Sequence, residues 1–192
     1  MIVIGGIALI LLLLALKGGT GTAILAPGTP GVKPTPYDSG LNPIDVGGQT
    51  VQVPPAVLQW RELANTYAEI YSILNPEEIL AIIWNESSGN QNAIHPNDQP
   101  DGSGSYGLMQ VSLSIGKHYA PDDVVSTVDL LNADTNVKAG AGFLSDLKNK
   151  YGDNPNWVAA YNEGETQFRK GVADQKYVDA FNLHVISIQE LG

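Results

Sequence analysis

The chain has no cysteine and few basic residues. Its 192 residues include ten lysines and arginines against twenty aspartates and glutamates, so the formal net charge is −10. The absence of cysteine excludes disulfide bonds and any lipid attached through a cysteine side chain. The shortage of positive charge argues against a basic nucleic-acid-binding face. We therefore expect no nucleic-acid partner, and we interpret the acidity as a contribution to solubility.

Several motifs of metal and cofactor enzymes are also missing. The three histidines, His95, His118 and His184, lack metal-ligand spacing and have no cysteines to complete a site. Residues 102–107 match the letters of a dinucleotide-binding loop, but no predicted strand precedes them. No Gly-x-Ser-x-Gly motif of a serine hydrolase occurs. We expect a function that needs neither a metal nor a cofactor.

The first sixteen residues are almost wholly apolar. The run from Ile2 to Leu16 is interrupted only by Gly5 and Gly6 and ends at Lys17. As a helix it would reach about 23 Å, which is short of the roughly 30 Å hydrocarbon core of a bilayer. A signal peptide would carry basic residues at its start, and this segment carries none. We therefore interpret residues 1–17 as a membrane anchor, with a cleaved signal as the alternative.

The next segment, residues 18–55, is rich in glycine and proline. Such a composition mixes flexible and extended stretches, which is typical of a linker. Within it, only Val51 to Val53 could pair as a short edge strand. We expect residues 56–192 to form the folded domain.

The pattern after Pro54 is helical. Apolar residues recur at helical spacing over 57–74, 137–151, 157–161 and 177–188. No convincing run of alternating strand residues appears. The sequence therefore predicts a mainly α domain, with a long loop between Asn90 and Tyr106 that has room for a small β-hairpin.

One acidic residue, Glu86, lies on the apolar face of a predicted helix. Ile79, Ile82 and Ile83 precede it by seven, four and three residues, so the four share a face. Capping signals begin the helix at Asn75, and it ends near residues 88–89, which places Glu86 in the last turn. Partial burial and the helix dipole would both raise its pKa, as a general acid requires. The alternative is a solvated glutamate at a frayed helix end.

Four motifs occur in order along the chain. They are Glu86-Ser87-Ser88-Gly89, Ser105-Tyr106-Gly107-Leu108-Met109-Gln110-Val111, Asn136-Val137-Lys138-Ala139-Gly140 and Ala159-Ala160-Tyr161-Asn162-Glu163-Gly164. In order and spacing they resemble the signatures of lytic transglycosylases, the peptidoglycan-cleaving relatives of goose-type lysozyme. The resemblance covers about residues 62–183. It implies a lysozyme-like fold, peptidoglycan glycan strands as the substrate, and Glu86 as the catalytic residue.

The resemblance also implies a mechanism. Glycosidic cleavage needs an acid for the leaving oxygen, and most glycosidases add a second carboxylate as nucleophile or base. The resembled enzymes use one glutamate as acid and then as base. The substrate's own 6-hydroxyl attacks, with assistance from the N-acetyl group, and leaves a 1,6-anhydromuramyl end. Glu86 would take both roles here.

Six further residues are expected to bind substrate: Ser88, Met109, Gln110, Tyr161, Asn162 and Tyr177. The Gln110 amide suits a sugar acetamido group, and the Met109 thioether suits a sugar face. The Tyr161 hydroxyl is expected near the catalytic carboxylate. Tyr177 also fits the apolar stripe of its own helix, so a core position is the alternative for it. Glu163 departs from the family pattern, which has a small residue there.

Two other functions remain open. Goose-type lysozymes direct water with aspartates near this region, and here Asp98 and Asp101 lie in a stretch typical of turns. A structural virion or secretion component that binds peptidoglycan with little activity is the third interpretation. The setting is either a phage virion that opens the wall during entry, which we favour, or a bacterial secretion or wall-remodelling system. Either setting predicts a membrane-anchored protein whose domain faces peptidoglycan.

Overall fold

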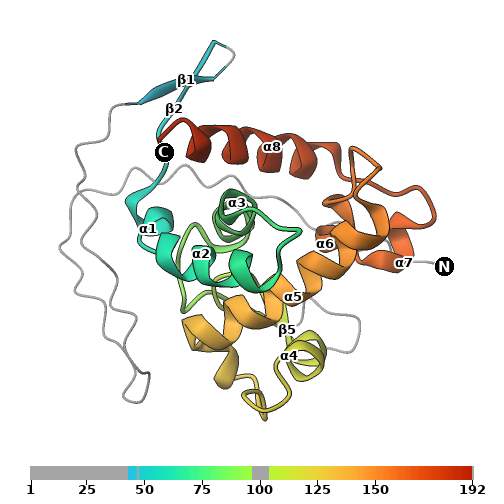
Figure 1. Cartoon of the computed structure of the whole chain (residues 1–192). Coiled ribbons are helices and arrows are strands. Elements are labelled where there is room, and N and C mark those ends of the chain that lie inside the picture. Colours follow the sequence, from blue (N-terminus) through green and yellow to red (C-terminus); the bar gives the residue numbers. More distant parts are fainter. Residues whose placement is uncertain (1–42, 47, 97–103, 192) are drawn as a thin grey trace.

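The computed structural model describes residues 43–46, 48–96 and 104–191, and this part of the chain is mainly helical (Figure 1). The helices are α1 (Pro55–Leu58), α2 (Arg61–Ile70), α3 (Pro76–Ser87), α4 (Leu113–Tyr119), the 3-10 helix η1 (Asp129–Leu131), α5 (Ala133–Tyr151), α6 (Ala159–Glu163), α7 (Glu165–Phe168) and α8 (Gln175–Gln189). The strands are β1 (Ile44–Val46), β2 (Gln49–Val51), β3 (Ile94–His95), β4 (Ser105–Tyr106) and β5 (Val111–Ser112). The predicted mainly α fold class is confirmed.

Helix α3 is the centre of the domain. The Glu78 carboxylate accepts a 2.8 Å hydrogen bond from the Asn75 main-chain N–H, which is half of a capping box. Ile79, Ile82 and Ile83 are fully buried, as their spacing predicts. The helix ends where Ser88 adopts a left-handed conformation with φ of 52°. The predicted position of Glu86 in its last turn is confirmed.

Helix α8 packs more extensively on α3 than any other helix does, although the two are far apart in sequence. In Figure 1, α8 crosses the top of the domain and α3 lies beneath it. The Asp174 carboxylate begins α8 by accepting a 2.9 Å hydrogen bond from the Lys176 N–H. Tyr177 then lies in the first turn, facing the core. This packing brings the start of α8 to the end of α3.

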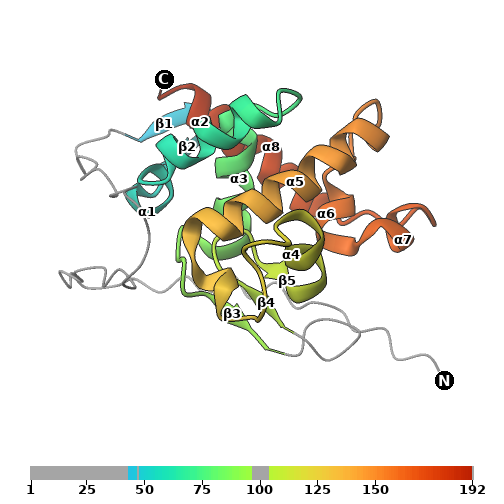
Figure 2. The ribbon, with the colours of Figure 1, turned by 60° about the horizontal axis from the view of Figure 1, so that its bottom comes forward.

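A small antiparallel sheet forms beside α4 in the order β3–β4–β5 (Figure 2). Ile94 pairs with Tyr106 and His95 pairs with Ser105, so the predicted β-hairpin is present. The third strand, β5, was not predicted, because two residues are too few to show an alternating pattern. Asp98 and Asp101 lie in 97–103, outside the described residues.

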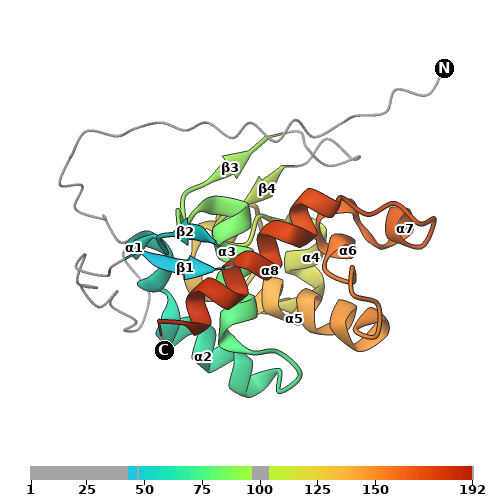
Figure 3. The same ribbon diagram turned by 90° about the horizontal axis from the view of Figure 1, so that it is seen from above.

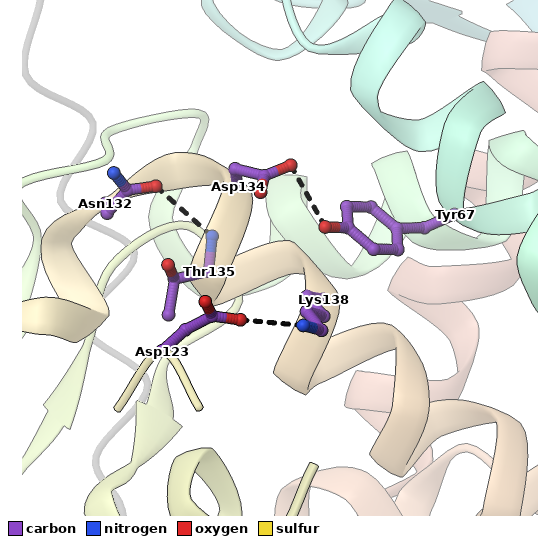
Figure 4. Close-up of polar contacts among 6 residues, drawn as sticks. All are labelled: Tyr67, Asp123, Asn132, Asp134, Thr135 and Lys138. Atoms are coloured by element: carbon purple, nitrogen blue, oxygen red, sulfur yellow. Dashed lines mark hydrogen bonds and ion pairs between the residues drawn. The ribbon is translucent and has the colours of Figure 1, made fainter. Parts of the chain in front are cut away.

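Polar contacts fix the first turns of α5 (Figure 4). The Asn132 side-chain oxygen, Oδ1, caps the helix by accepting from the Thr135 N–H at 3.2 Å. The Tyr67 hydroxyl on α2 donates to Asp134 at 3.0 Å, and Lys138 pairs with Asp123 at 2.7 Å. These contacts hold α5 against both α2 and the loop that precedes it.

The folded unit begins earlier than the sequence predicts. Strands β1 and β2 form a hairpin within the segment interpreted as a linker, and β1 contacts α8 (Figure 3). Val53 is only 3% exposed and belongs to the hydrophobic core. The predicted boundary at residue 56 is therefore too late, because the flanking glycines and prolines masked three-residue strands.

No helix within the described ranges is both long and apolar enough to cross a membrane. The predicted anchor, residues 1–17, and most of the predicted linker lie outside those ranges.

Candidate active site

Glu86 meets the hydroxyl of Tyr177 at the junction of α3 and α8. The Tyr177 hydroxyl donates a short hydrogen bond to Glu86 Oε1, across 91 residues of sequence. Tyr177 is 8% exposed, so its ring takes the alternative core position, and substrate contact by this residue stays a prediction. Burial first, and then the Glu86 carboxylate, raise the pKa of Tyr177 well above its usual range. Tyr177 therefore remains a protonated donor at neutral pH.

Tyr161 approaches the same carboxylate from α6. Burial raises the pKa of its phenol well above the usual range, and the nearby negative charge of Glu86 adds to this shift. Its hydroxyl, however, donates a 2.8 Å hydrogen bond to the main-chain carbonyl of Met109. The tyrosine that hydrogen-bonds Glu86 is thus Tyr177, while Tyr161 joins the glutamate's surroundings to the 107–110 loop.

The 107–110 loop is held by one buried side chain, Asn136 of α5. Its Nδ2 donates to the carbonyls of Tyr106 and Leu130 at 2.7 and 2.8 Å, and its Oδ1 accepts from the Met109 N–H at 2.8 Å. Asn136 is fully buried. Gly107 has φ of 75°, and a Cβ there would lie 2.4 Å from Asn136 Nδ2. The asparagine of the third motif therefore organises the loop of the second.

Gln110 uses its amide within the protein. Its Nε2 donates to the main-chain carbonyls of Gly107 at 2.7 Å and Ala93 at 3.2 Å. Its Oε1 lies in hydrogen-bond contact with His95 Nδ1 on β3. Its backbone also has a positive φ of 49°. Binding of a sugar acetamido group stays a prediction, and it would require one of these bonds to be exchanged.

The prediction for the Met109 side chain is wrong. Met109 is fully buried, and a Cβ at Gly140 would meet its sulfur at 2.6 Å, so the thioether packs against α5 and presents no face to a sugar. The sequence could not distinguish these two positions, because a loop methionine can lie in a groove or in the core equally well. Met109 serves the site through its carbonyl, which accepts from Tyr161.

The other predicted residues lie around Glu86 with less defined roles. Ser88 is exposed at the C-cap of α3, two residues after Glu86. Asn162 is partly exposed on α6, next to Tyr161, and its amide donates to the Glu163 carboxylate at 3.4 Å. Substrate contact by Ser88 and Asn162 stays a prediction.

A cluster that the sequence did not suggest lies beside the glutamate. The rings of Trp84 on α3 and His184 on α8 stack with centroids 3.7 Å apart and planes inclined by 6°. Asn85, between Trp84 and Glu86, has a buried amide that interacts with the Tyr177 hydroxyl in the direction that lowers its pKa. Helical spacing alone could not pair these residues, because the contact depends on how α8 docks on α3.

A mainly helical domain in which a helix-end glutamate meets two buried phenols beside a small sheet is a lysozyme-like arrangement. Comparison with known families matches residues 62–183 to the family described as Transglycosylase SLT domain. The chain therefore belongs to this family of lytic transglycosylases, which act on peptidoglycan. The resemblance found in the four motifs is confirmed, over the residues it was expected to cover. No curated protein matches the chain.

Proposed function

We propose that the protein cleaves the β-1,4 bond between N-acetylmuramic acid and N-acetylglucosamine and leaves 1,6-anhydromuramyl ends. Glu86 acts first as the acid and then as the base. The observation that carries this proposal is the contact of the Tyr177 hydroxyl with the Glu86 carboxylate, in a setting that Tyr161 shares. Both neighbours are phenols, so neither supplies a second carboxylate, and Tyr177 orients the one that is present.

The proposed reaction needs no added proton. Glu86 protonates the glycosidic oxygen as the bond to the anomeric carbon breaks, which releases the 4-hydroxyl of the N-acetylglucosamine. The 6-hydroxyl of the muramic acid then bonds to that carbon and gives its proton to Glu86. The glutamate thus returns to its starting state. The Tyr177 hydroxyl keeps the carboxylate oriented through both steps, since it remains protonated.

The test is mass spectrometry of the fragments that the full chain releases from purified peptidoglycan sacculi. We expect anhydromuramyl fragments from the native protein and none from Glu86→Gln, which keeps the shape of the side chain but cannot transfer the proton. Fragments heavier by one water would instead identify a goose-type hydrolase. That result would direct attention to Asp98 and Asp101. Binding to sacculi without release of fragments would favour a structural role.

We also propose that residues 1–17 anchor the protein in a membrane, with residues 43–191 facing peptidoglycan. The apolar character of that segment and the peptidoglycan-cleaving family of the domain support this arrangement. Local wall opening during phage entry or secretion would fit an enzyme with a single catalytic domain behind an anchor. Extraction tests the anchor, since an anchored protein stays with the membrane at high salt and leaves it only in detergent.

A further inference from the structure

We propose that Trp84 and His184 position Tyr177 on Glu86. These residues do not act on the substrate themselves. The inference rests on the proposed catalytic role of Glu86. Both rings are partly buried, and the proposal gives their stack a function beyond packing.

The geometry places two contacts across one helix interface. Trp84 and Glu86 are two residues apart in the last turns of α3, and Tyr177 and His184 are seven residues, or about two turns, apart on α8. The first contact is the parallel stack of Trp84 on His184, and the second is the bond from Tyr177 to Glu86. Both pairs join the same two helices.

The stack restricts the orientation of α8 on α3 more than the Tyr177–Glu86 hydrogen bond alone would. Apolar packing holds α8 on α3 but does not by itself fix small rotations of α8 about its axis, and a small rotation moves a hydroxyl by more than a hydrogen bond tolerates. A flat stack at 3.7 Å and 6° resists such rotations, because tilting or sliding would separate the ring faces. The stack therefore sets the direction in which Tyr177 points. Displacements of about 1 Å in catalytic geometry are enough to lower rates about 100-fold.

The protonation state of His184 suits a stacking role. Burial lowers the pKa of His184 to about 4, so the ring is neutral under neutral conditions. Its Nδ1 is buried and has no hydrogen-bond partner among the described residues. The ring thus acts by its shape and its face, which a phenylalanine could reproduce.

A double-mutant cycle in the full chain tests the proposal, with kcat and KM measured on soluble peptidoglycan glycan strands. We expect His184→Ala and Tyr177→Phe each to lower kcat about 10-fold with KM changed less than about 2-fold. If His184 acts through Tyr177, the double variant should be no slower than the slower single variant. His184→Phe should keep kcat within about 3-fold of the native value, because it retains the stack.

The matched control is Ile188→Ala, one turn further along α8 at a fully buried position. It should lower the melting temperature as His184→Ala does, but its effect on kcat should multiply with that of Tyr177→Phe. The proposal is overturned if His184→Ala and Tyr177→Phe also multiply. It is overturned as well if His184→Phe is as slow as His184→Ala.

A second measurement is independent of catalysis. In protein labelled at the tyrosine ζ carbon, the NMR signal of Tyr177 is assigned by its loss in Tyr177→Phe. We expect this signal to move in His184→Ala and to stay in place in His184→Phe and Ile188→Ala. An unmoved signal in His184→Ala would refute the positioning role. If the native protein failed to cleave any peptidoglycan, the proposed function would fail while this measurement still decided the role of the stack.

Discussion

The Tyr161 hydroxyl donates a 2.8 Å hydrogen bond to the main-chain carbonyl of Met109, and so joins α6 to the 107–110 loop. Tyr177 donates instead to Glu86. Tyr177 is buried and Tyr161 is partly buried near the same carboxylate, and loss of solvent contact raises the pKa of both phenols. One therefore holds the acid, and the other holds the loop beside it.

Removing the Tyr161 hydroxyl should weaken the loop more than it weakens the acid. Tyr161→Phe leaves the Met109 carbonyl without its donor, at a cost of about 1–2 kcal/mol in the free energy of unfolding. We expect kcat/KM on peptidoglycan to fall about 10-fold, since the loop loses its tie to α6. Tyr151→Phe, which removes a hydroxyl bonded to Glu165 on another part of the surface, is the control. Equal activity of the two variants would contradict the prediction.

Asn136 should be one of the most sensitive positions for stability. Asn136→Ala removes the side chain that bonds the Tyr106 and Leu130 carbonyls and the Met109 N–H, so we expect the free energy of unfolding to fall by about 2–4 kcal/mol. Urea denaturation measures the loss. Asn149→Ala, at an exposed position on the same helix, should change stability little. A small loss in Asn136→Ala would mean that the loop is held by other contacts.

The stability of the protein should depend on pH through His184. Its pKa is about 4 when folded against 6.5 when unfolded, so the unfolded state binds more protons between these values. Stability is then fully present above pH 6.5 and is lost as pH falls toward 4, by about 3 kcal/mol. Denaturation at pH 7 and pH 4.5 should show a smaller loss in His184→Phe than in the native protein. His95 and His118 are common to both and cancel in the comparison. An equal loss in the two proteins would rule the mechanism out.

The ion pair of Glu78 with Lys148 should contribute to the stability of the protein because it is largely buried. Lys148 Nζ lies 2.6 and 2.7 Å from the two Glu78 oxygens, and Glu78 is only 8% exposed. Lys148→Met leaves a buried carboxylate unpaired, and we expect a loss of about 2–4 kcal/mol on thermal or urea unfolding. Combining it with Glu78→Gln should restore most of that loss.

Two further results would qualify the Lys148 prediction. Lys138→Met breaks the exposed pair with Asp123 and should have little effect. If the combined Glu78→Gln and Lys148→Met variant stayed as unstable as Lys148→Met alone, the loss would come from the Lys148 ammonium over the Trp157 ring, 5.8 Å from its centroid, and not from the ion pair.

Local signals were enough to predict α3 and the position of Glu86. The capping residues from Asn75 and the apolar spacing up to Ile83 act within one helix, so they can be read without knowing the rest of the fold. The tyrosine partner of Glu86 could not be read in this way. Tyr177 reaches Glu86 only because α8 docks on α3, and its sequence pattern indicated a core position equally well.

The second motif shows the same limit. Its residues could be recognised in order, but burial decides what each side chain does. Met109 faces the core. The Gln110 amide bonds to the carbonyls of Ala93 and Gly107 and to the His95 ring. Motif spacing identifies which residues matter. It does not say whether a side chain faces the groove or supports the residue that does.

The hairpin of β1 and β2 also determines which element would bear a force applied to the chain segment that precedes it. The described fold begins at residue 43, directly before β1, and β1 contacts α8. Helix α8 carries Tyr177 in its first turn, so tension on the N-terminal segment would be borne by the same helix that holds the acid. A fragment that starts at α1 would lack β1 and its contact with α8. A catalytic fragment that preserves the native mechanics should therefore start no later than residue 43.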